Sequence, residues 1–81
     1  MTAKDKANAG LWLLKQAILE VLANESGGMQ PSQVHYALGF KMPESPQAGI
    51  VYAVMTLMSE GHELEKGEGH HPVYRVKKST H

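Results

Sequence analysis

Hydrophobic residues recur with helical spacing in three segments of the chain and alternate with polar residues near its C-terminal end. The first segment covers residues 11–24 and predicts a helix. The residues that fall on one stripe of this helix are Leu11, Leu14, Ile18, Val21 and Leu22. Residues 1–10 lack such a stripe, so we expect them to form a disordered tail, and residues 79–81 to fray.

The second segment follows the turn-forming sequence Ser26-Gly27-Gly28. Met29-Gln30 is expected to form a short strand that joins a later hairpin. Pro31 suits the first position of a helix, where its missing N–H costs nothing. Gly39 suits the C′ position that ends a helix, with Phe40 folding back on the last turn.

A third helix is predicted from the N-cap residue Ser45 and Pro46 to Gly61. The residues expected to face the core are Ile50, Ala53, Val54, Leu57 and Met58. Those expected to face outward are Gln47, Ala48, Val51, Tyr52, Met55 and Ser59. Two short strands, 62–66 and 73–77, follow around a Gly-Glu-Gly-His-His-Pro tip and predict an antiparallel hairpin.

This order of elements, with Gln-Pro-Ser-Gln-Val-His-Tyr-Ala-Leu-Gly as the second helix, resembles the winged helix-turn-helix domains of bacterial and archaeal regulators. The resemblance covers residues 11–78. It implies an α+β fold of three helices with a two- or three-stranded antiparallel sheet. It also implies duplex DNA binding in transcriptional or mobile-element regulation, with the third helix in the major groove and the wing on the backbone. The superfamily also contains members that bind proteins.

The sequence of residues 64–76 is similar to the wing of Z-form-binding winged helices in RNA-editing deaminases. Pro72 and Tyr74 match the proline-rich tip and the aromatic residue that follows it. The Asn and Tyr of that family's third helix correspond here to Val51 and Met55, so Z-form binding is not inferred. The Val-Tyr-Arg-Val strand is also similar to winged helices attached to restriction enzymes.

Composition indicates one domain in a chain of 81 residues without cysteine. Eight Lys or Arg residues balance eight Asp or Glu residues, so the whole molecule does not attract a polyanion. A DNA-binding surface must therefore segregate its charge onto one face. No apolar run approaches the ~20 residues that span a bilayer, and residues 1–10 do not resemble a signal peptide, so a cytoplasmic protein is expected.

Several outward residues of the predicted third helix are candidate base contacts. Gln47 can make a bidentate contact, Val51 and Met55 can meet thymine methyl groups, and the Tyr52 hydroxyl can reach a phosphate. The residues expected to contact the phosphate backbone are Ser32, Gln33, Lys41, Ser45, Lys66, His70, His71, Arg75 and Lys77. As an alternative, Val51, Tyr52 and Met55 form an apolar patch that docks a protein partner.

Trp12 and Leu19 lie seven residues apart on a second face of the first helix. They either wrap the side of a small core or form a dimer interface. His62, His70 and His71 lack the spacing of a known metal motif, so no metal is expected. No nucleophile–base pair and no phosphate-binding loop occurs, so neither catalysis nor a cofactor is expected.

Overall fold

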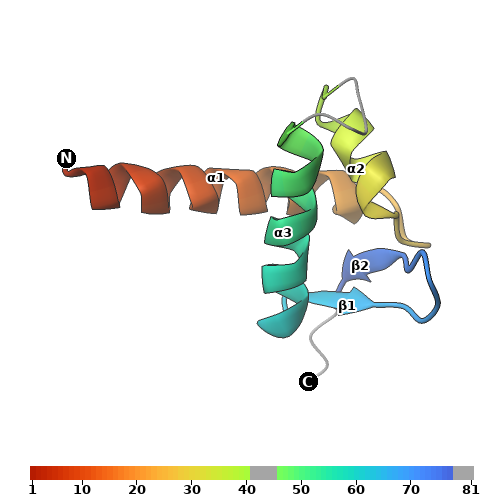
Figure 1. Cartoon of the computed structure of the whole chain (residues 1–81). Coiled ribbons are helices and arrows are strands. Elements are labelled where there is room, and N and C mark those ends of the chain that lie inside the picture. Colours follow the sequence, from red (N-terminus) through yellow and green to blue (C-terminus); the bar gives the residue numbers. More distant parts are fainter. Residues whose placement is uncertain (41–45, 78–81) are drawn as a thin grey trace.

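The computed structural model describes residues 1–40 and 46–77 of the chain. Its helices and strands are α1 (Ala3–Ala23), α2 (Pro31–Ala37), α3 (Pro46–Glu60), β1 (Leu64–Lys66) and β2 (Tyr74–Val76). α3 crosses α1, and α2 and the hairpin lie on the same side of that crossing (Figure 1). The predicted α+β class, with three helices and an antiparallel hairpin, is confirmed. Among the described residues, no helix combines the length and hydrophobicity needed to cross a membrane.

Helix α1 begins eight residues earlier than the hydrophobic pattern predicts. The hydroxyl of Thr2 accepts a hydrogen bond from the Asp5 N–H at 3.2 Å, and the Asp5 carboxylate accepts one from the Thr2 N–H at 3.3 Å. This reciprocal capping satisfies backbone donors at the helix start, so residues 3–10 are helical where a disordered tail was predicted. Only the C-terminal half of α1 packs against the other elements, and the N-terminal half projects beyond α3 (Figure 1).

The core is centred on α3. Its buried hydrophobic residues are Ile18, Leu22, Val34, Val51, Val54, Met55, Met58, Leu64 and Tyr74. Val51 and Met55 are fully buried, whereas Ile50 and Leu57 are 54% and 51% exposed. The predicted orientation of α3 is therefore wrong by about one residue, or about 100° of rotation. Apolar residues stand on several sides of α3, and the two long methionine side chains can fill the space beneath the hairpin.

The ends of α2 agree with the sequence-based prediction, and α3 ends at Glu60, directly before the predicted stop at Gly61. Pro31 is the first residue of α2, and Gly39 follows its C-terminus with φ +88°, while the Phe40 N–H donates to the His35 carbonyl at 3.2 Å. After α3 the left-handed conformation falls on His62, with φ +64°, and not on Gly61. The predicted N-cap, Ser45, lies outside the described residues.

The hairpin is joined to the rest of the molecule through Tyr74. β1 and β2 pair with Leu64 opposite Val76 and Lys66 opposite Tyr74. Met29 forms a further antiparallel bridge to Tyr74, in which the Met29 N–H donates to Tyr74 at 2.9 Å and the Tyr74 N–H donates to Met29 at 2.7 Å. This confirms that Met29 pairs with the hairpin. Tyr74 is a fully buried core residue, so it does not belong to the exposed surface of a wing.

Gly28 allows the chain to approach this bridge. Its φ is +86°, and a Cβ atom at this position would lie 2.9 Å from the Tyr74 carbonyl oxygen. A side chain would therefore strain the backbone and also push against a backbone atom that is already hydrogen-bonded to Met29.

We predict that Gly28→Ala lowers the free energy of unfolding by about 2 kcal/mol or more, because a left-handed non-glycine residue alone costs ~1–2 kcal/mol. Gly27→Ala is the matched control, since a Cβ atom there meets no other atom within 4 Å. It should change the stability by less than about 0.5 kcal/mol. Chemical denaturation measures both, and equal losses would contradict the role of Gly28.

The Tyr74 hydroxyl is buried and has no hydrogen-bond partner among the described residues. Burying such a group costs free energy that folding does not recover. We predict that Tyr74→Phe leaves the stability unchanged or raises it by up to about 1 kcal/mol, with Tyr36→Phe at an exposed tyrosine as control. A loss above about 1 kcal/mol in denaturation would show that the hydroxyl stabilises the fold.

Candidate functional site

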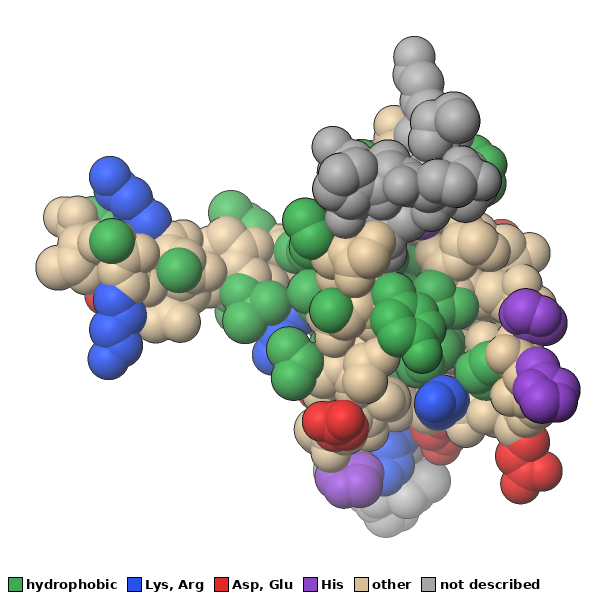
Figure 2. All heavy atoms as spheres, viewed as in Figure 1, with side chains coloured by type: hydrophobic (Ala, Val, Ile, Leu, Met, Phe, Trp, Pro, Cys, Tyr) green, Lys and Arg blue, Asp and Glu red, His purple; other side chains and the backbone are tan. Residues whose placement is uncertain are grey.

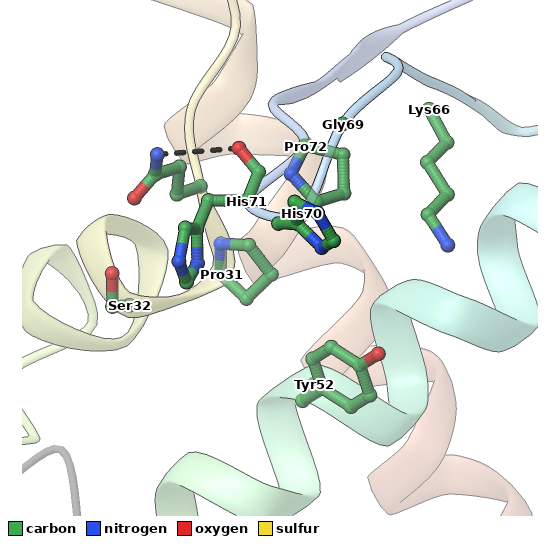
Figure 3. Close-up of a pocket in the computed structure, with 9 residues that line it drawn as sticks. Pro31, Ser32, Tyr52, Lys66, Gly69, His70, His71 and Pro72 are labelled. Atoms are coloured by element: carbon green, nitrogen blue, oxygen red, sulfur yellow. Dashed lines mark hydrogen bonds between the residues drawn. The ribbon is translucent and has the colours of Figure 1, made fainter.

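A groove of about 300 Å³ lies between the start of α2, the middle of α3 and the tip of the hairpin (Figure 3). The residues that line it are Gln30, Pro31, Ser32, Tyr52, Lys66, Gly69, His70, His71 and Pro72. They come from three segments that are far apart in the sequence, and the fold brings them together.

The hairpin tip is held against the N-terminal end of α2. The Gln30 side-chain amide donates a hydrogen bond to the His71 carbonyl at 3.3 Å, which Figure 3 shows as a dashed line. Within the hairpin, the Gly67 N–H donates to the Val73 carbonyl at 2.8 Å. Together with the pairing of Met29 and Tyr74, these bonds define where the tip lies relative to α3.

The groove presents hydrogen-bonding groups from both of its sides. Tyr52 extends from α3 and is 54% exposed, and Lys66 extends from β1 beside it (Figure 3). His71 lies next to Ser32 on the opposite side, with His70 between the two sides. Adjacent histidines in a regular strand would point to opposite faces, but both of these line the groove because the tip is a bend.

Among the described residues, no carboxylate lines this groove, although acidic and basic residues balance over the whole chain. Lys66 provides a positive charge, and the two imidazoles and two hydroxyls provide donors without a formal negative charge. On this face, Figure 2 shows basic and histidine side chains beside hydrophobic ones, with acidic side chains close to them in the lower part of the view. The described lining of the groove thus holds hydrogen-bond donors and one positive charge, which suit an anion.

Lys66 and Arg75 were both predicted to contact the phosphate backbone, but they lie on opposite faces of the hairpin. Lys66 is opposite the buried Tyr74, whereas Arg75 is opposite Glu65 on the other face. Arg75 lines a separate depression of about 640 Å³ together with Glu25 and Glu65. Its surroundings are therefore acidic, and Arg75 does not contribute to the groove. Lys77 is exposed beyond β2 and does not line the groove either.

The other predicted contact residues have different outcomes. Val51 and Met55 are buried in the core, so neither can present a side chain to a base or to a protein partner on an outer face of α3. The Gln33 side-chain carbonyl accepts a hydrogen bond from the Gln30 N–H at 2.8 Å and so caps α2. Two further predicted residues, Lys41 and Ser45, lie outside the described residues, and so does the side chain of Gln47.

Trp12 and Leu19, which were predicted either to wrap the side of the core or to form a dimer interface, differ in exposure. Leu19 is partly buried against the core, whereas Trp12 is 59% exposed on the projecting half of α1. Gln30 and Pro31 were not predicted as groove residues, because their place in the groove depends on where the hairpin folds. The proline at the start of a helix gave no signal beyond its local role.

Within residues 1–40 and 46–77, no three His, Asp or Glu side chains come together in a way that could hold a metal ion. Comparisons of the chain with protein-family models, with curated proteins and with solved structures find no match.

Proposed function

We propose that this protein is a non-catalytic winged-helix regulator. It binds duplex DNA through the groove between α3 and the hairpin tip. The observation that carries the proposal is that Lys66, Tyr52, His70 and His71 line one groove that no carboxylate of the described residues lines, in a chain with no net charge. The order of the elements and the bridge from Met29 to the hairpin support it, because they correspond to the winged-helix layout.

In this mechanism a segment of the phosphate backbone lies along the groove. The Lys66 ammonium group pairs with a phosphate, and the hydroxyls of Tyr52 and Ser32 donate hydrogen bonds to phosphate oxygens. The imidazoles of His70 and His71 donate from the tip. Gly69 has no side chain, so the DNA backbone can approach the tip closely.

Backbone contacts of this kind position a protein on DNA but carry little sequence information. Because Val51 and Met55 are buried, the contacts that they were expected to make with thymine methyl groups are lost. Gln47 remains the proposed base-reading residue of α3. We therefore propose binding that depends strongly on salt and discriminates weakly between sequences.

The alternative of a protein-docking patch on α3 is weaker in its predicted form. Of Val51, Tyr52 and Met55, only Tyr52 is exposed, and it faces a groove whose other polar groups suit an anion. Tyr52 is a single aromatic residue beside the positively charged Lys66. This setting suits a hydrogen bond from its hydroxyl to a phosphate better than it suits an apolar protein interface.

We predict that Lys66→Ala weakens binding to a labelled mixed-sequence DNA duplex by about tenfold, because a hydrogen bond to a charged group contributes ~1.5 kcal/mol or more. It should also make the slope of log affinity against log salt shallower by about 0.9 for each groove engaged. Fluorescence anisotropy at several salt concentrations measures both quantities.

Arg75→Ala is the matched control, because it removes the same formal charge from the opposite face of the hairpin. It should leave the affinity within about twofold, since an exposed charge outside the groove acts only through a screened field. Equal losses for Lys66→Ala and Arg75→Ala would place the contact elsewhere. An absence of binding by the unmodified protein at low salt would contradict the function itself.

A further inference from the structure

The projecting half of α1, residues 3–13, is exposed along its whole length and is called the arm below. The arm ends in Leu11-Trp12-Leu13, and Leu14 follows. Successive residues of a helix lie about 100° apart, so these four side chains surround the helix. A helix that is apolar on all sides is normally buried, yet Trp12 and Leu13 are 59% and 60% exposed. The domain itself covers only one side of this segment.

A second exposed apolar surface lies on α3 and consists of Ile50, Ala53 and Leu57, called the α3 flank below. These residues are spaced by three and four positions, so they form one stripe. Tyr52 follows Ile50 by two positions, or about 200° around the helix, so the α3 flank points away from the groove. Figure 2 shows hydrophobic side chains gathered where the arm meets α3.

We propose that the arm and the α3 flank together bind a second copy of this chain in a reciprocal exchange of arms. In a dimer with a two-fold axis near Leu11, the two arms lie antiparallel and each reaches the α3 flank of the other copy. Lys4 of one arm then stands level with Ile18 of the other, which packs in the core beneath α3. Each copy uses the same surface, as a two-fold dimer requires.

The size of the surfaces favours this arrangement over a contact between arms alone. The arm is about 16 Å long, at 1.5 Å for each residue, and one side of so short a helix falls well below the ~800 Å² for each partner that stable interfaces bury. The α3 flank supplies the additional area. A dimer of this form covers the sides of Leu11, Trp12 and Leu13 that the domain leaves exposed.

The α3 flank carries no charge itself, but a charged residue at the end of the same helix is complementary to the arm. The arm carries Lys4 and Lys6, whereas Asp5 is engaged in capping the helix. Glu60 is the only charged residue of α3, and it lies at the C-terminal end, where the helix dipole is negative. In the exchange, the lysine-bearing arm of one copy lies beside the α3 of the other, whose one charged residue is acidic. The neutral net charge also means that no overall repulsion opposes self-association.

The exchange leaves both grooves accessible, because Tyr52 and the α3 flank lie on opposite sides of α3. The dimer therefore carries two copies of the proposed DNA-binding groove. The dimer proposal does not depend on DNA binding, so either proposal can fail without the other.

Sedimentation velocity of the full chain over a wide concentration range tests the proposal through molecular mass. We expect the dimer mass at high concentration and dissociation on dilution. Trp12 is the only tryptophan, so its fluorescence reports on the interface directly. Its emission should move to longer wavelength as the dimer dissociates and water reaches the indole ring. A monomer mass at every concentration, with constant emission, would overturn the proposal.

Variants separate arm exchange from other dimers. Leu13→Glu in the arm and Leu57→Glu in the α3 flank should each raise the dissociation constant of the dimer by about tenfold or more. Tyr36→Glu, at a large exposed residue of α2, is the control and should leave it unchanged. A dimer that survives Leu57→Glu excludes the exchange, and circular dichroism verifies that each variant is folded. Lys66→Ala should leave the mass unchanged, so a failure of DNA binding remains distinguishable.

Discussion

The pairing of Met29 with Tyr74 is the contact on which the arrangement of this molecule depends. Its two hydrogen bonds, at 2.9 Å and 2.7 Å, join the connection between α1 and α2 to the second strand of the hairpin. The Tyr74 ring is buried in the core beside residues of α1 and α3, so the same residue anchors the hairpin by its backbone and by its side chain. The hairpin tip can face α3 across a groove only because this anchor is in place, and Gly28 gives the backbone room to form it.

Much of the fold follows from local signals in the sequence. Pro31 and Gly39 mark the ends of α2 through backbone properties that do not depend on tertiary contacts, and both were predicted correctly. The orientation of α3 was not, because Ile50, Val51, Met55 and Leu57 are all apolar. A helix that is apolar on several sides has no strong periodicity, and tertiary packing selects the buried side.

The candidate site was only partly predictable for a similar reason. Lys66 and Arg75 are both basic residues of the hairpin, and composition alone grouped them together. Alternation along a strand separates them once the register is known, since Lys66 is opposite Tyr74 and Arg75 is opposite Glu65. The groove itself joins residues of α2, α3 and the tip, and nothing in their local sequence indicates that they meet. By contrast, Thr2 and Asp5 have the spacing of a helix cap, and that signal was available for the start of α1.

The central claim is that the groove between α3 and the hairpin tip contacts the DNA backbone. An amide-shift titration of isotope-labelled protein with a mixed-sequence duplex at low salt tests it most directly. The account predicts shifts at Ser32, Tyr52, Lys66 and residues 69–71 that diminish as salt rises, with Arg75 and Glu25 unaffected. Shifts centred on Arg75 and Glu25, or an absence of shifts at low salt, would contradict it.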